Sequence, residues 1–110
     1  MKLPYRENAF IPPPKLKDYL LSETHPIGKA KSKFFRGAGF NEMNLDMLEQ
    51  GLLNMALAED VIEVGSSPHG TKYILDGPVL TPTGRIVHIR TVWIIDTGQD
   101  RPRFVTAFPA

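Results

Sequence analysis

The feature that most constrains this fold is a long run of β-branched residues near the C-terminus. Residues 85–95 are rich in isoleucine, valine and threonine, and they contain neither glycine nor proline. Side chains of this kind favour the extended backbone of a strand. We therefore predict one long strand from Arg85 to Ile95 and expect neighbouring segments to pair with it.

Three other segments have the character of strands. Val61–Val64 is apolar and β-branched, Thr71–Asp76 alternates between its two faces, and Arg103–Phe108 forms a final short run. Turn-forming residues separate these segments at 65–70, at Gly77, at 81–84 and at 96–100. The pattern predicts a four-stranded antiparallel sheet.

The first half of the chain has helical spacing instead. Three consecutive prolines end at Pro14 and favour an extended arm over residues 1–13, after which a short helix is predicted for Pro14–Leu21. A second helix is expected from Pro26 to Phe35, stopped by Gly37 and Gly39. Asn44 is a good N-cap for a third helix that should end between Ala58 and Asp60.

Helices that precede strands with short connections indicate an α+β fold. We expect residues 14–110 to form one domain, with the N-terminal helices packed on one face of the four-stranded antiparallel sheet. A chain of 110 residues is within the usual size of a single domain.

Composition excludes several classes of site. The chain has no cysteine, which excludes disulfides, thiolate zinc sites and cysteine nucleophiles. No apolar run approaches the roughly 20 residues of a membrane helix, and residues 1–10 lack the apolar region of a signal peptide. We therefore expect a cytoplasmic protein with no membrane association.

Charge is strongly segregated along the chain, although the net charge is only +1. Residues 1–40 carry eight lysines and arginines against three acids, a net charge of +5. Residues 41–69 carry six acids and no lysine or arginine. The segregation is compatible with a basic face for a polyanion, and equally with solvated helix faces of different sign.

Strand periodicity places cations on one face of the predicted sheet. In the long strand, the face carrying Trp93 is the more apolar and should meet the helices, whereas His88 and Arg90 point to the other side. We expect Lys72 to lie opposite Arg90, Arg90 opposite Phe108, and Val92 opposite Thr106. Two cations facing each other favour an anion between them. The alternative is that both cations are solvated and paired with Asp76 or a helix acid.

The remaining chemistry is acid–base chemistry on a phosphate. His25, His69 and His88 are far apart and follow no metal-binding spacing, and no phosphate-binding glycine loop or serine elbow occurs. Metal-free RNA cleavage needs an acid–base group, which histidine supplies, and cations for the phosphorane. Histidine together with Lys72, Arg90 and Thr106 would make up such a set; no metal or cofactor is expected.

Several longer motifs resemble an uncharacterised bacterial domain family whose members end in an R-T-V-W … G … P-R-x-V-T-A-Y-P pattern. The resemblance covers about residues 10–109, and its motifs are Gly70–Gly77, Thr81–Arg85, Arg90–Trp93 and Pro102–Pro109, with His25, Pro26, Gly28–Lys31, Phe34, Phe35, Gly39 and Phe40 upstream. This chain has Phe108 where the pattern has tyrosine, so no phenol is available at that position.

Domains of this family occur as small stand-alone proteins, often encoded beside another short protein, and as C-terminal modules of large bacterial toxins. Their layout is similar to the barnase–EndoU–colicin–RelE group of metal-independent ribonucleases. The resemblance implies a ribonuclease toxin that binds RNA and is neutralised by a small antitoxin or immunity protein encoded nearby.

These observations together predict a metal-independent endoribonuclease of the toxin–antitoxin type. The predicted catalytic residues are His25, Lys72, Arg90 and Thr106, and the predicted substrate-binding residues are Lys29, His88, Thr91 and Arg103. The alternatives are a non-catalytic module that binds RNA or another anion, and a protein-interaction domain that uses its acidic third helix and its last strand.

Overall fold

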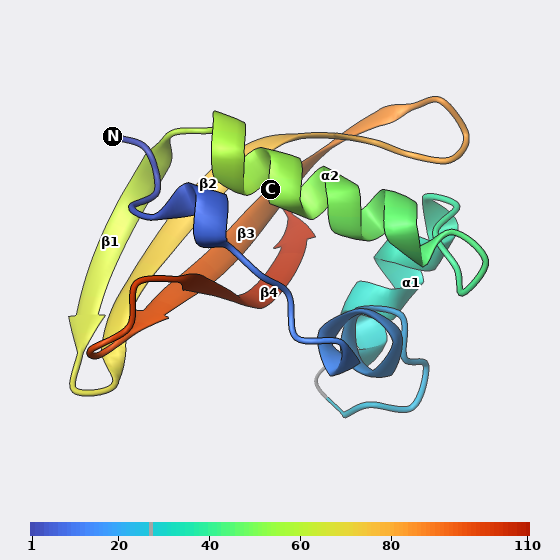
Figure 1. Cartoon of the computed structure of the whole chain (residues 1–110). Helices are drawn as coiled ribbons and strands as arrows, with labels where there is room; N and C mark the ends of the chain where they lie inside the picture. Colours follow the sequence, from blue (N-terminus) through green and yellow to red (C-terminus); the bar gives the residue numbers. More distant parts are fainter. Residues whose placement is uncertain (27) are drawn as a thin grey trace.

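The computed structural model describes residues 1–26 and 28–110. Two short helices, η1 (Arg6–Asn8) and the π-helical turn η2 (Leu16–Leu20), precede α1 (Lys29–Gly37) and α2 (Leu45–Ala58). Four strands follow: β1 (Val61–Ser67), β2 (Gly70–Leu80), β3 (Ile86–Asp96) and β4 (Pro102–Pro109). They form one antiparallel sheet in the order β1-β2-β3-β4 (Figure 1). The predicted α+β fold with a four-stranded antiparallel sheet is confirmed.

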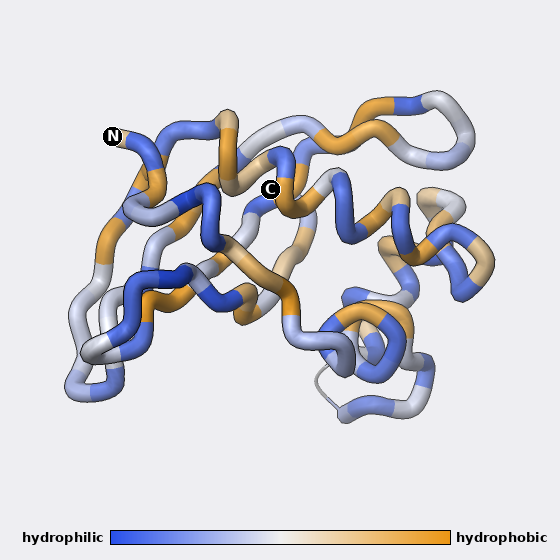
Figure 2. Tube along the Cα trace, viewed as in Figure 1, coloured by the Kyte–Doolittle hydropathy of each residue, from blue (hydrophilic) through white to orange (hydrophobic). Residues whose placement is uncertain are grey.

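One face of the sheet packs against α2, which crosses it in Figure 1. Hydrophobic and hydrophilic residues alternate along the trace of this helix (Figure 2), which is the pattern of a helix with one buried side. The core beneath it is made of buried side chains from the helix, including Leu48 and Leu52, and from the strands, including Leu75, Trp93 and Phe104. On the other face, Lys72 is exposed and Ile74, Asp76, Arg90 and Val92 are partly exposed, so we call it the open face.

Of the other helices, η2 and α1 lie beside one end of α2 (Figure 1). They contact each other, and α1 also contacts β4. Leu16 and Leu20 of η2 and Phe35 of α1 are buried in the common core. This burial anchors η2 and α1 at the β4 edge, where their polar side chains reach the open face of the sheet.

The N-terminal residues pack on the domain rather than leaving it. Leu3 and Ile11 are buried in the core. Lys2 forms an isolated backbone β-bridge with Asp60, and Phe10 forms another with Arg103. The bridge at Phe10 covers part of the outer edge of β4.

In the described part of the chain, none of the helices combines the length and the apolar character that crossing a membrane requires.

The predicted helix boundaries hold best for the third helix. It begins after Asn44 and ends at Ala58. The Asn44 side chain bonds to the preceding turn instead of to the helix, accepting from the Asn41 N–H at 2.8 Å. The second helix begins at Lys29 rather than at Pro26, and Ile27 lies outside the described residues.

The predicted turn at Gly77 is wrong, because β2 runs on through Gly77 and Pro78 to Leu80. Gly77 lies against the Glu59 side chain, which would be within 2.6 Å of an added Cβ atom. Pairing with β1 stops at Leu75, so Pro78 falls where β2 has no neighbour on that side and needs no N–H for pairing there. The β2–β3 hairpin is therefore longer than expected and closes at residues 81–85.

Candidate functional site

The open face of the sheet is defined by three rows of residues that lie side by side across β2, β3 and β4. The rows are Lys72–Ile94–Arg103, Ile74–Val92–Thr106 and Asp76–Arg90–Phe108. The predicted pairs Arg90–Phe108 and Val92–Thr106 are confirmed.

The predicted pairing of Lys72 with Arg90 is wrong. Lys72 lies opposite Ile94, and Arg90 lies opposite Asp76. The cause is the longer hairpin, which shifts the pairing while keeping both cations on the same face.

Arg90 is held by its neighbour on β2. Its Nε and Nη2 atoms donate to the two carboxylate oxygens of Asp76 at 2.7 and 2.8 Å. These hydrogen bonds hold the pKa of the Asp76 carboxyl below its usual value and raise the pKa of Arg90. The structure thus shows the alternative in which Arg90 is paired with Asp76. The carboxylate of Asp76 largely compensates the charge of Arg90.

Thr106 contacts the helical part of the protein. Its hydroxyl shares a hydrogen bond of 2.9 Å with the hydroxyl of Tyr19, which is carried by η2. The bond is partly buried and joins residues 87 positions apart in the sequence. Docking of η2 beside β4 therefore brings a phenol to the open face, although position 108 of the strand is phenylalanine.

His25 lies on the other side of Tyr19, in the turn before α1. The two rings pack edge to face with their centroids 5.1 Å apart. The Nδ1 atom of His25 accepts a hydrogen bond of 3.1 Å from the Gly28 N–H, so the proton of the neutral ring is on Nε2. The predicted residues His25 and Thr106 are thus brought to the same place, with Tyr19 between them.

Two lysines surround the Tyr19 ring. The ammonium group of Lys15 is 4.8 Å from the ring centroid, and that of Lys31 is 5.9 Å away. Lys31 is also 6.0 Å from the centroid of Phe108, so the two aromatic rings flank the same cation. We call Tyr19, His25, Lys31, Thr106 and Phe108 the tyrosine cluster.

Arg103 lies beside this cluster and lines a hollow with Tyr19 and His25. It donates two hydrogen bonds of 3.0 Å to Asp96, which lower the pKa of that carboxyl and raise the pKa of Arg103. The guanidinium is about one-third exposed. Arg103 therefore adds positive charge to the rim of the hollow, partly offset by its carboxylate partner.

The other predicted site residues lie elsewhere. Lys29 is exposed at the start of α1, His88 is exposed opposite Pro78, and His69 is exposed in the β1–β2 turn. Thr91 is fully buried on the face that meets α2, where its hydroxyl accepts a hydrogen bond of 3.0 Å from the Trp93 indole. Thr91 therefore contributes to the core and not to the open face.

Four residues in or beside the tyrosine cluster were not predicted as site residues: Tyr19, Lys15, Lys31 and Phe108. Tyr19 was expected only as one residue of the short predicted helix Pro14–Leu21. The signal in the sequence was the lysine-rich character of residues 15–33, which does not reveal which lysines approach β4.

No group of three or more histidine, aspartate or glutamate side chains within residues 1–26 and 28–110 is placed to hold a metal ion. The hollow beside the tyrosine cluster is also lined by Lys15, Arg103 and the carboxylate of Asp18. The polar groups of the cluster itself are two hydroxyls, an imidazole and one ammonium ion. Such groups bind an anion such as phosphate and transfer protons to it.

Comparisons with known proteins agree with this fold. Residues 2–110 match the family described as domain of unknown function DUF6883. No curated protein matches the chain. One chain of a solved structure, titled "Contact-dependent growth inhibition toxin - immunity protein complex from Klebsiella pneumoniae 342", is similar with a TM-score of 0.75 at 13% identity, over 96% of this chain and 96% of that chain. The similarity at this identity shows a shared fold.

Proposed function

This chain belongs to the DUF6883 family, and we propose that it is a metal-independent endoribonuclease of the toxin type. In this proposal the tyrosine cluster binds and cleaves a phosphodiester of RNA. The observation that carries it is the convergence of His25 and Thr106 on Tyr19, with Lys31 alongside.

The charges and hydroxyls of the cluster suit a phosphate group. Lys31 and Lys15 offer ammonium ions, Arg103 offers a guanidinium at the rim, and the hydroxyls of Tyr19 and Thr106 offer hydrogen bonds. Charge-assisted hydrogen bonds of this kind are stronger than neutral ones. They also stabilise the extra negative charge that a phosphorane carries.

Cleavage of RNA within its own backbone needs one proton to move. The 2′-oxygen attacks phosphorus, the bond to the 5′-oxygen breaks, the 2′-hydroxyl loses its proton, and the departing oxygen gains one. Histidine is the side chain that both gives and takes protons near neutral pH. We assign the proton transfer to His25: its Nδ1 atom takes the 2′-hydroxyl proton after releasing the Gly28 N–H, and its Nε2–H then gives a proton to the departing oxygen. Tyr19 and Thr106 orient the phosphate.

Lys72 and Arg90 have no catalytic part in this proposal. Asp76 holds Arg90 with two hydrogen bonds, and strand β3 lies between Lys72 and Thr106. Lys29 and His88 remain outside the cluster as well. They are available for weak contacts with more distant parts of an RNA chain.

The test is incubation of the pure protein with total RNA in EDTA, followed by a denaturing gel. We expect cleavage products, and we expect His25→Ala to lower the rate about 100-fold or more, the usual contribution of a proton-transfer group. Thr106→Val removes a hydrogen bond to the phosphate and should lower the rate about tenfold or more. His88→Ala is the matched control and should keep the parent rate. If the RNA stays intact but the protein still binds it in a separate binding assay, only the RNA-binding alternative remains. If the protein neither cleaves nor binds RNA, both the ribonuclease proposal and the RNA-binding alternative are contradicted.

A toxin role and a small neutralising partner are the second part of the proposal. The shared fold with a chain of a toxin–immunity complex supports this part. Induced expression of the chain alone should arrest growth, and expression of the His25→Ala variant should not. Normal growth with the parent protein, at a level of soluble protein equal to that of the variant, would contradict the toxin role.

A further inference from the structure

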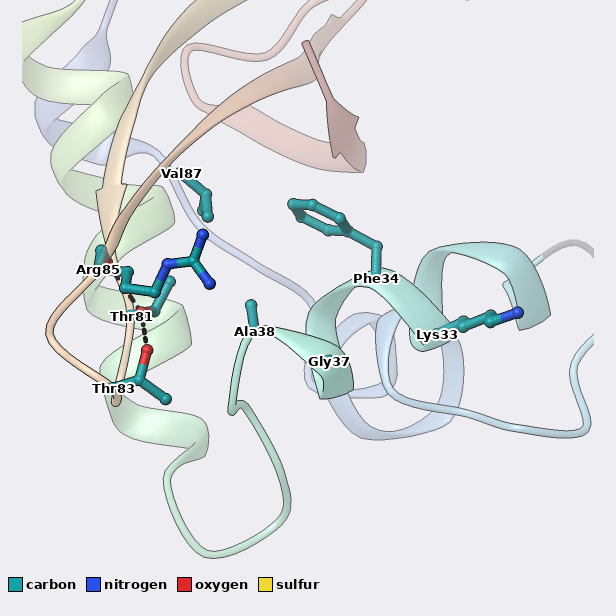
Figure 3. Close-up of a pocket in the computed structure, with 8 residues that line it drawn as sticks. All are labelled: Lys33, Phe34, Gly37, Ala38, Thr81, Thr83, Arg85 and Val87. Atoms are coloured by element: carbon teal, nitrogen blue, oxygen red, sulfur yellow. Dashed lines mark hydrogen bonds between the residues drawn. The ribbon is translucent and has the colours of Figure 1, made fainter.

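A second hollow lies between α1 and the β2–β3 hairpin, apart from the tyrosine cluster (Figure 3). Its wall on the helix side includes Phe34 and Ala38, and its wall on the hairpin side includes Thr83, Arg85 and Val87. We call these five residues the hairpin pocket.

The pocket exists because the β2–β3 hairpin extends beyond the end of β4. Pairing of β3 with β4 reaches only Ile89 and Pro109, whereas β2 and β3 stay paired out to Leu80 and Ile86. The tip of the hairpin rests against the end of α1 at Gly39, where an added Cβ atom would be 3.2 Å from Thr83. This contact fixes the distance between the helix wall and the hairpin wall of the pocket.

Two planar groups face each other across this space. Figure 3 shows the Arg85 guanidinium and the Phe34 ring directed toward the gap from opposite walls. Within the described residues, nothing forms an ion pair or a hydrogen bond with the Arg85 side chain. Arginine and aromatic rings are the side chains on which nucleic-acid bases stack. We infer that the hairpin pocket binds a nucleobase of single-stranded RNA between Arg85 and Phe34.

A hydroxyl group is available for the edge of that base. The Thr81 hydroxyl donates to the Arg85 carbonyl at 2.8 Å, so in its 3.0 Å contact with Thr83 it is the acceptor. Thr83 therefore uses its proton inside the hairpin and keeps lone pairs on its oxygen. An N–H group of a base is the partner that these lone pairs accept.

A further hollow lies on the other side of α1. Lys33 points away from the hairpin pocket in Figure 3, and it also lines that hollow with Glu23, Lys29, Ser32 and Arg36. The Ser32 hydroxyl is buried there and has no hydrogen-bond partner among the described residues. Glu23 forms an ion pair of 3.4 Å with Arg36, so the hollow carries charges of both signs and is not part of the proposed base site.

The hairpin pocket also lies next to the proposed cleavage site. Phe34 and Lys31 are three residues apart on α1, a spacing that puts side chains about 5–6 Å from each other at Cβ. A strand of RNA held at Lys31 thus reaches Phe34 with a neighbouring nucleotide. The assignment of RNA as the ligand rests on the proposed function, whereas the pocket itself does not depend on cleavage.

The experiment measures binding of a fluorescent single-stranded RNA by anisotropy, in the His25→Ala background so that the RNA stays intact. Arg85→Ala and Phe34→Leu should each weaken binding about tenfold, which is the usual effect of removing one stacking partner. The Arg85→Lys variant should also bind the RNA weakly, because lysine keeps the positive charge but lacks the planar guanidinium group. Arg6→Ala removes the same charge from a partly exposed side chain on η1 and should change binding less than about twofold.

Unchanged binding in Arg85→Ala and Phe34→Leu, with both variants folded by circular dichroism, would overturn the inference and leave cleavage untouched. Full binding by Arg85→Lys would also overturn it, because a point charge would then suffice. Titration of the parent protein with AMP, followed by NMR, should shift the signals of Phe34, Thr83 and Arg85. Those shifts in a protein that does not cleave RNA would support the pocket while contradicting the proposed function.

Discussion

At the scale of single residues, the Tyr19 hydroxyl is the group that connects the two parts of the proposed site. It bonds to Thr106 on β4, and its ring packs against His25 before α1. Lys15 and Lys31 lie near the same ring. A substitution at Tyr19 therefore tests the arrangement more directly than a substitution of any one cation.

Tyr19→Phe should lower RNA cleavage about tenfold or more while leaving the ring contacts in place. The physical reason is the loss of one hydroxyl that holds Thr106 and the phosphate, since net hydrogen bonds to charged groups contribute about 1.5–3 kcal/mol. Tyr5→Phe removes the hydroxyl of an exposed tyrosine outside the proposed site, and it should leave the cleavage rate unchanged. Equal rates for Tyr19→Phe and the parent would remove the tyrosine from the site.

At the scale of elements, the decisive contact is between the turn η2 and the start of α1. A Cβ atom on Gly28 would overlap the carbonyl oxygen of Tyr19, so glycine is needed where these segments meet. The same residue donates its N–H to His25. The position of the histidine and that of the tyrosine thus depend on one close backbone approach.

Gly28→Ala should destabilise the protein by about 1–3 kcal/mol, the usual cost of overpacking, and should lower cleavage further than the loss of stability explains. Gly37→Ala is the matched control, because a Cβ atom there meets nothing within 4 Å. In a helix it should be neutral or stabilise by up to about 1 kcal/mol. Urea unfolding of both variants measures this difference, and equal stability of Gly28→Ala and the parent would contradict the prediction.

At the scale of the whole molecule, two carboxylates on the sheet connect stability to pH. Hydrogen bonds from Arg90 and Arg103 lower the pKa values of Asp76 and Asp96 in the folded protein. A carboxyl with a lowered folded pKa stabilises the fold above its unfolded pKa, which is about 3.9 for aspartate. That contribution is lost as the pH falls through the folded pKa.

The double variant Asp76→Asn, Asp96→Asn should therefore show a shallower fall in melting temperature than the parent as the pH drops from about 6 to below 4. Asp100→Asn, at an exposed loop position, should follow the parent curve. Thermal unfolding at a series of pH values measures the three curves. Parallel curves for the double variant and the parent would show that these ion pairs do not couple folding to protons.

Local patterns in the sequence determined much of this protein. Alternation along residues 85–95 placed Trp93 in the core and Arg90 on the open face, because strand periodicity acts over neighbouring residues. The short turn at 96–100 made the pairing of Val92 with Thr106 predictable from hairpin geometry. The helix after Asn44 was predictable because its N-cap and its helical spacing are also local signals. His25 and Thr106 were selected for their chemistry, and the structure brings them to one place.

Only the tertiary structure decided the contacts between distant segments. The length of the β2–β3 hairpin set Asp76, not Lys72, beside Arg90, and it opened the hairpin pocket opposite Phe34. Burial of Leu16 and Leu20 docked η2 beside β4 and so joined Tyr19 to Thr106. Contacts of this kind depend on how apolar faces pack, and neither the spacing nor the type of the residues involved encodes them locally.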